Sequence, residues 1–105
     1  MSDTEMLYNV IRPYLRKLGY SESSIKTDVK IEGLRADAVV YQDNDAFIVI
    51  EVKAKSSALT TNNDLSLLKF DPDVRQVQAT ASLLNAPYFI LTDGKSFLWF
   101  ETDVT

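Results

Sequence analysis

An acid and a base follow a strongly apolar segment near the middle of the chain. Residues 47–50 (FIVI) lead directly into Glu51, and Lys53 follows after one residue. Because alternate side chains of a strand point to the same face, Glu51 and Lys53 share a face. Asp37 lies on the preceding strand of a predicted hairpin, and a loop at 43–45 makes it oppose Glu51 directly. The spacing therefore predicts that two carboxylates and an ammonium group converge.

These groups suit metal-assisted phosphate chemistry. Two opposed carboxylates repel each other unless a positive charge lies between them, and Mg²⁺ or Mn²⁺ takes oxygen ligands. Asp37, Glu51 and the Val52 carbonyl form a candidate metal site, beside which Lys53 could orient a metal-bound water or stabilise negative charge on a phosphate. The alternative is a strand end in solvent, where Glu51 and Lys53 form a surface ion pair and Asp37 is a turn residue. A register shift of one residue would remove the site.

Composition narrows the possible chemistry. The 105 residues are expected to form a single domain, 1–105. The chain has no cysteine and no histidine, so thiol chemistry, histidine bases and zinc sites built on these residues are excluded. The net charge of −4 disfavours a nucleic-acid binder, since such domains are usually basic. We expect a cytoplasmic protein, because no signal peptide and no membrane-length apolar stretch is present.

The pattern of apolar residues predicts the order αβββαββ. A first helix is expected over 3–18, broken at Pro13 and ended by Gly19. A second is expected from an N-cap at Asp71 to Asn85, after a polar loop over 56–70. Strands are predicted over residues 25–31, 36–41, 46–54, 88–91 and 97–100. We therefore expect an α/β domain, with a mixed sheet and a helix on each face.

At these residues the sequence resembles a known family. Asp37, with Glu51-x-Lys53 after an apolar strand, resembles the D…(D/E)xK signature of the PD-(D/E)XK nuclease superfamily. The wider pattern is similar to the nuclease domain at the N-terminus of type I restriction enzyme R subunits. The matching features are Thr4-Glu5, Leu18-Gly19-Tyr20, Leu34-Arg35-Ala36-Asp37, Ile50-Glu51-Val52-Lys53, Gln76 and Ile90-Leu91-Thr92-Asp93-Gly94. The resemblance implies a restriction-endonuclease-like fold, with a central mixed sheet flanked by helices.

The resemblance also implies roles for individual residues. Asp37 and Glu51 would bind the metal, and Lys53 would be the catalytic lysine. Glu5 would occupy the place of a helix glutamate that helps to bind metal or water, although it also completes an S-x-x-E capping box with Ser2. The family's proline before the aspartate is replaced by Ala36, which changes little because the aspartate holds the metal.

A glutamine motif of the family is incomplete in this chain. Gln76 matches the glutamine of a Q-x-x-x-Y motif, but Thr80 stands at the tyrosine position. Gln78 is a weaker substitute, and an exposed polar helix face would explain both glutamines. Lys55 could contact a phosphate or could simply be solvated. The sequence has no G-x-x-x-x-G-K-[ST] loop, so we expect a stand-alone relative without a nucleotide cofactor.

Two functions from different classes follow. The first is a metal-dependent deoxyribonuclease that hydrolyses DNA phosphodiester bonds with Mg²⁺ or Mn²⁺. The second is a non-catalytic DNA-binding or assembly module that keeps the nuclease fold. The apolar segment 97–100 (FLWF) would be adhesive at a sheet edge and could pair two copies into a homodimer, unless it is an interior strand. Possible phosphate contacts are Lys26, Lys30, Arg35, Lys55, Lys69, Arg75 and Lys95.

Overall fold

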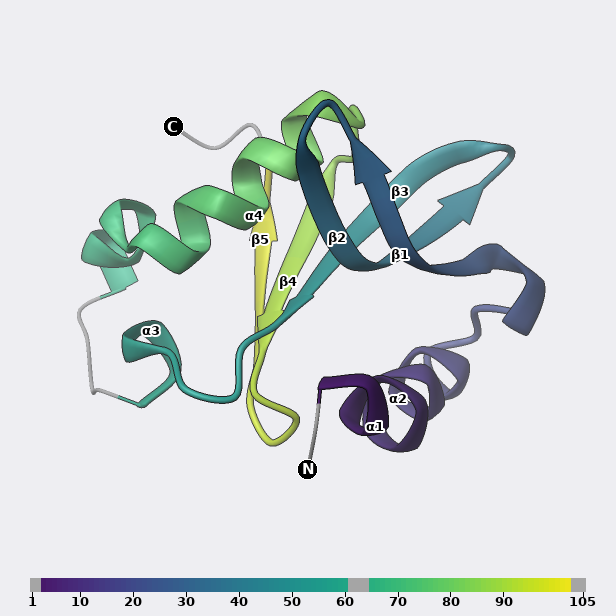
Figure 1. Ribbon diagram of the computed structural model, residues 1–105, viewed down its shortest axis with the longest axis horizontal. Helices are drawn as coiled ribbons and strands as arrows, with labels where there is room; N and C mark the ends of the chain where they lie inside the picture. Colours follow the sequence, from purple (N-terminus) through teal and green to yellow (C-terminus); the bar gives the residue numbers. More distant parts are fainter. Residues whose placement is uncertain (1–2, 61–64, 103–105) are drawn as a thin grey trace.

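A five-stranded mixed sheet with helices on both faces forms the body of the protein (Figure 1). The computed structural model describes residues 3–60 and 65–102. Neighbouring strands follow chain order, and every pair is antiparallel except β3 and β4, which run parallel. The strands are β1 (Ile25–Ile31), β2 (Leu34–Gln42), β3 (Asp45–Val52), β4 (Tyr88–Thr92) and β5 (Phe97–Glu101). The predicted α/β class and mixed sheet are confirmed.

The first helix is interrupted just before its proline. It consists of α1 (Asp3–Met6), a π-helical turn (Leu7–Ile11) and α2 (Arg12–Lys17). Pro13 has no N–H to donate, and just before it the N–H of Arg12 bonds to the Leu7 carbonyl, five residues back. Gly19 ends the helix with φ +104, and the Tyr20 N–H closes the last turn on Leu15 at 3.2 Å. The predicted break and end are therefore confirmed, while Ser2 of the capping box lies outside the described residues.

The β2–β3 hairpin combines a tight turn with a bulge. Asp43 and Asn44 have φ of 53° and 70°, as a two-residue type I′ turn requires, so the predicted loop at 43–45 was one residue too long. The pairing then shifts between Val40 and Tyr41, because Phe47 is an extra residue in β3. Beyond this bulge Ala38 pairs with Ile50, which is the register that the longer loop predicted.

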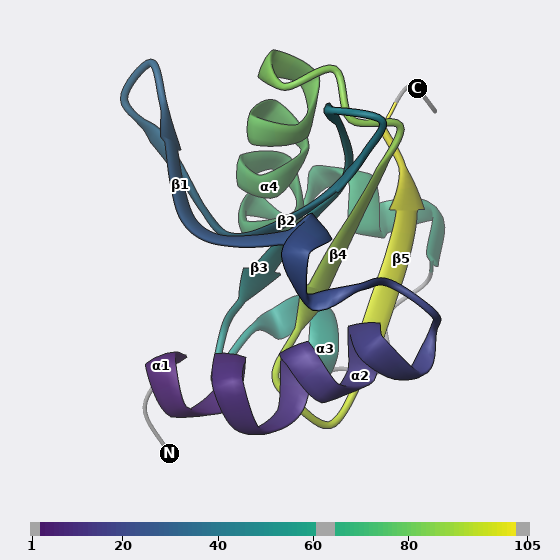
Figure 2. The same cartoon turned by 90° about the vertical axis from the view of Figure 1, so that its right-hand side faces the viewer.

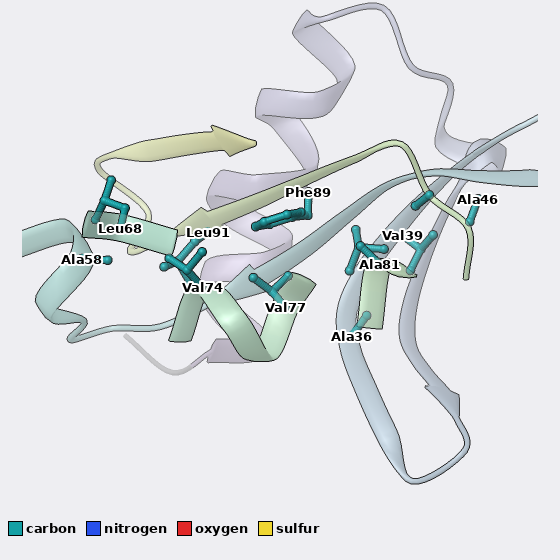
Figure 3. Close-up of a cluster of buried hydrophobic side chains, with 12 residues drawn as sticks. Ala36, Val39, Ala46, Ala58, Leu68, Val74, Val77, Ala81, Phe89 and Leu91 are labelled. Carbon is teal, nitrogen blue, oxygen red and sulfur yellow. The ribbon is translucent and has the colours of Figure 1, made fainter. Parts of the chain in front are cut away.

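Helix α4 (Pro72–Leu83) covers one face of the sheet. Asp71 is its N-cap, as predicted, and accepts hydrogen bonds from the N–H groups of Asp73 and Val74 at 2.9 and 3.3 Å. Figure 3 shows the apolar side of the helix facing the strands. The residues buried there include Val74, Val77, Ala81, Val39, Val49, Phe89 and Leu91.

The N-terminal helix covers the opposite face, and Figure 2 shows the sheet lying between the two helical layers. Its residues bury a second apolar cluster against the strands. This cluster includes Leu7, Ile11, Leu15, Ala38, Val40, Ile48, Ile50 and Ile90. Both faces of the central strands are therefore covered, which explains why residues 38–41 of β2 and 46–50 of β3 are apolar at every position.

The expected polar loop over 56–70 contains helical structure instead. A short helix α3 (Ser57–Thr60) and a 3₁₀ helix (Leu65–Phe70) occupy part of it. The buried Ser56 donates its hydroxyl to the Asp73 carboxylate at 2.7 Å, and Ala58 and Leu68 join the core under α4. These tertiary contacts hold Ser56, Ala58 and Leu68 in place, and they leave no periodic pattern in the sequence.

Strand β5 lies at the edge of the sheet, so the alternative of an interior strand is wrong. Its Trp99 side chain is 43% exposed. The indole N–H donates to the Tyr14 hydroxyl at 2.9 Å, and the Tyr14 ring stacks on Phe97 with centroids 3.8 Å apart. Within the described residues, no helix combines the length and apolarity needed to cross a membrane.

Candidate active site

Asp37 and Glu51 lie together where β2 and β3 run side by side. The last pair of the β2–β3 ladder is Ala38–Ile50, and the same register continued by one residue sets Asp37 opposite Glu51. Its Oδ2 accepts a hydrogen bond from the Val52 N–H at 2.7 Å, which fixes the carboxylate at the end of β3. Asp37 is only 7% exposed, so this is a buried acid rather than a turn residue in solvent.

The proximity of the two acids changes the pKa of Glu51. Burial raises this pKa most, and the charge of Asp37 and a hydrogen bond to it raise it further, to about 8. Lys53 and Arg35 lower it by smaller amounts. Without a metal, Glu51 therefore keeps a proton near neutral pH. Two neighbouring buried carboxylates are not both ionised unless a stronger positive charge lies close to them.

Arg35 supplies part of that charge. Its Nη2 donates to Asp37 Oδ1 at 2.5 Å, and its Nε lies 3.5 Å from Asp28 Oδ1. Both oxygens of Asp37 are thus engaged, one by the main chain and one by a side chain that is itself 54% exposed. Sequence reasoning named Arg35 only as one of several scattered phosphate contacts. The i, i+2 spacing of Arg35 and Asp37 on one strand was the signal for this pair.

A local irregularity in β1 lies beside Asp37. The β1–β2 ladder runs from the Thr27–Ala38 pair to the Val29–Ala36 pair without a pair at Asp28. Asp28 has φ of 54°, a left-handed conformation that an aspartate tolerates better than most residues. The register is the same on both sides of Asp28, and its carboxylate lies within reach of Arg35 on the neighbouring strand.

Lys53 follows the last residue of β3. Its N–H donates to the Thr92 carbonyl at 2.9 Å, so the parallel pairing with β4 holds its backbone. The side chain is half-buried, and its charge acts on Glu51. The structure thus brings Asp37, Glu51 and Lys53 together. Lys55, by contrast, is exposed.

The two glutamines of α4 differ in their surroundings. Gln76 is exposed on the helix, and its carbonyl accepts the hydroxyl of the buried Thr80 at 3.3 Å. Gln78 donates its amide to the Thr102 carbonyl at 2.9 Å, so it ties α4 to the segment after β5. Thr80 is a core residue of the helix and not a surface counterpart of the family tyrosine.

The N-terminal helix also approaches Asp37. Thr4, Leu7 and Tyr8 line a cavity of about 280 Å³ together with Asp37. Glu5 is exposed and is not one of the residues that line it. In the part of the chain that the structure describes, no group of three or more metal-ligating side chains gathers. Any metal would rest on two carboxylates and main-chain oxygen.

The basic residues expected as possible phosphate contacts are scattered along the sequence, and each of them is exposed to solvent. They are Lys26, Lys30, Arg35, Lys55, Lys69, Arg75 and Lys95. Arg35 differs from the others because two carboxylates hold it.

The donor set suits a small hard cation. Asp37 is held by a main-chain hydrogen bond, and Glu51 keeps a proton that a cation could replace. These are oxygen donors, which Mg²⁺ and Mn²⁺ prefer.

Comparison with known proteins places the chain in a family. No curated protein and no solved structure matches it. The family model described as type I restriction enzyme R protein N terminus (HSDR_N) matches residues 9–105, a range that includes Asp37, Glu51 and Lys53 and leaves out Glu5. Since this match spans most of the sequence, the chain belongs to the family of type I restriction enzyme R protein N-termini.

Proposed function

We propose that this protein is a metal-dependent nuclease of the PD-(D/E)XK type that hydrolyses phosphodiester bonds in DNA. The observation that carries the proposal is the pair of packed carboxylates, Asp37 and Glu51, with Lys53 beside them. Burying two carboxylates side by side costs folding free energy, so such pairs are found mainly at functional sites. The chain's family is the N-terminal region of a restriction enzyme subunit, and this supports the same class of reaction.

Asp37, Glu51 and the Val52 carbonyl would hold Mg²⁺ or Mn²⁺. The bound metal would polarise a phosphate oxygen and make a coordinated water more acidic. Lys53 would place its ammonium next to the reacting phosphate and stabilise the negative charge that grows on it. The Val52 N–H would keep Asp37 in place throughout, since that hydrogen bond is buried. Glu5 and Gln76, both exposed, are secondary candidates for contacts with metal, water or DNA.

Arg35 competes with the metal for Asp37. Its guanidinium bonds the oxygen that a cation would use, so we expect Arg35→Ala to tighten Mg²⁺ binding by about tenfold, the effect of roughly 1.4 kcal/mol. Titration calorimetry on the DNA-free protein measures this directly. Lys30→Ala, which removes an exposed positive charge elsewhere on the β1–β2 hairpin, is the matched control. Equal affinities in wild type and Arg35→Ala would contradict a metal site at Asp37.

Cleavage assays test the nuclease itself. Supercoiled, linear, single-stranded and branched DNA are incubated with the protein and Mg²⁺ or Mn²⁺, with EDTA as the control. The proposal expects metal-dependent strand breaks in at least one substrate. Intact DNA in every reaction, with no heat of metal binding, would contradict it.

The second candidate is a non-catalytic DNA-binding or assembly module. The closed Arg35–Asp37 pair favours it, because it occupies a carboxylate oxygen that a catalytic metal would need, and the net charge of −4 favours an assembly role over DNA binding. It predicts DNA retention in a mobility assay that Asp37→Asn and Lys53→Ala leave unchanged, together with the absence of cleavage.

The exposed β5 edge supports a further proposal, that two copies pair through it. An unpaired, partly apolar edge strand can add a second strand, and Trp99 is exposed there. We expect sedimentation equilibrium to report a dimer that Leu98→Lys weakens by disrupting the edge, whereas Lys30→Glu on β1 has no effect. A wild-type monomer at high concentration would contradict the proposal.

A further inference from the structure

The cavity beside Asp37 has the size and lining of a site for one small planar ligand. Its volume of about 280 Å³ lies just below the roughly 300–1,000 Å³ of pockets that bind drug-sized molecules. The Tyr8 ring and the Leu7 side chain give it an apolar part, and Thr27 and Asp28 of β1 give it hydrogen-bonding groups. Asp37 belongs both to this cavity and to the candidate active site.

The charges around the cavity favour a base over a phosphate. Among the residues that line the cavity, Asp28 and Asp37 carry two carboxylates and Arg35 carries one positive charge, which is already paired with both acids. A phosphate would be repelled by this excess of negative charge. The amino groups on the edges of adenine, cytosine and guanine are hydrogen-bond donors, and a carboxylate such as that of Asp28 can accept from them.

Tyr8 is the aromatic residue among those that line this cavity. The residue is 56% exposed, although the Arg12 guanidinium lies over its ring at 5.4 Å from the centroid. Arg12 is itself tied to Glu22 by an ion pair. The ring is therefore held in position by its own helix while it stays accessible, which is the property of aromatic platforms on which nucleobases stack.

We infer that this cavity binds one unpaired nucleobase, next to the phosphate that the Asp37–Glu51 site attacks. The inference rests on the proposed function and specifies its substrate class. A base inside a duplex is stacked on both sides and cannot enter without leaving the helix. The preferred substrates are therefore DNA strands with an unpaired nucleotide at the cleavage point, such as single strands and flaps.

Binding of oligonucleotides that contain a single 2-aminopurine tests the inference. The measurements are made in EDTA, so that no hydrolysis is required, on a single strand and on the duplex of the same sequence. Wild type is expected to bind the single strand more tightly and to quench 2-aminopurine at one position. Tyr8→Leu is expected to lose about tenfold or more in single-strand affinity, the usual effect of removing one stacking ring, with duplex binding unchanged. Tyr8→Phe, which keeps the ring, should behave as wild type.

Tyr88→Leu is the matched control, because Tyr88 is 36% exposed and packs on Phe47 away from this cavity. Unchanged single-strand affinity in Tyr8→Leu, or equal losses on both DNAs, would overturn the inference. If Tyr8→Leu does not fold, the absence of quenching by wild type at every position overturns it equally. Cleavage without any preference for unpaired DNA would contradict the base site but not the proposed nuclease activity. Binding that depends on the Tyr8 ring, without cleavage of any DNA, would support the base site and contradict the nuclease activity.

Discussion

Replacement of Lys53 by alanine is expected to lower the rate of metal-dependent DNA cleavage by about a hundredfold to a thousandfold. This is the usual loss when one group that stabilises charge in the transition state is removed. Lys53 is half-buried beside Glu51, and its backbone is fixed to β4. Quantified strand breaks under single-turnover conditions give the rate.

Lys55→Ala is the control for this experiment. It removes the same charge two residues further on, from an exposed side chain, and should retain most of the activity. Asp37→Asn should be as damaging as Lys53→Ala, because the amide keeps the shape of the residue and loses the charge that binds metal. A Lys53→Ala protein with undiminished cleavage would remove Lys53 from the mechanism.

The metal-free protein is expected to lose stability as the pH rises from about 4.5 to 8. The pKa of Glu51 is raised from 4.5 to about 8 in the folded state, so across this interval the folded protein binds a proton that the unfolded chain releases. Stability falls with rising pH wherever the folded state holds more protons. Above pH 8 Glu51 is ionised in both the folded and the unfolded state. Its destabilising effect is then complete, and the free energy of unfolding no longer changes with pH through this group.

Glu51→Gln should therefore stabilise the metal-free protein at pH 9. We expect a gain of about 1–2 kcal/mol, well below the full value of the shift because the carboxyl group is only half-buried and solvent screens it. For a domain of this size the melting temperature would rise by several degrees. Thermal unfolding in EDTA at pH 5, 7 and 9 measures the effect, and Glu101→Gln, which changes an exposed acid, is the control.

Mg²⁺ binding should reverse the loss of stability that ionised Glu51 causes at pH 9. Mg²⁺ is expected to raise the melting temperature of wild type at pH 9 by binding only the folded state, and to leave Glu51→Gln almost unchanged. A wild-type protein with a flat stability profile between pH 5 and 9 would show that Glu51 is not confined with Asp37. Stabilisation of both proteins by Mg²⁺ to the same extent would place the metal elsewhere.

In the β2–β3 hairpin, the error in the predicted turn length did not affect the predicted pairing further along the strands. The turn at Asp43-Asn44 is shorter than the sequence suggested, and the bulge at Phe47 restores the pairing at Ala38 and Ile50. The side-chain alternation along β2 and β3 could be predicted because both strands are apolar and must keep their faces in the core. The bulge could not, since a single extra residue leaves no change in the apolar pattern.

The sequence by itself determined the order of elements, the helix signals at Pro13, Gly19 and Asp71, and the shared face of Glu51 and Lys53, because each depends on residues close in the chain. Only the tertiary structure decided that Asp28 of β1 pairs with Arg35 of β2, that Ala58 and Leu68 enter the core under α4, and that Tyr8 and Asp28 meet at one cavity. Those contacts join separate elements, whose side-chain directions depend on the left-handed backbone at Asp28 and on packing. No spacing rule within one segment contains that information.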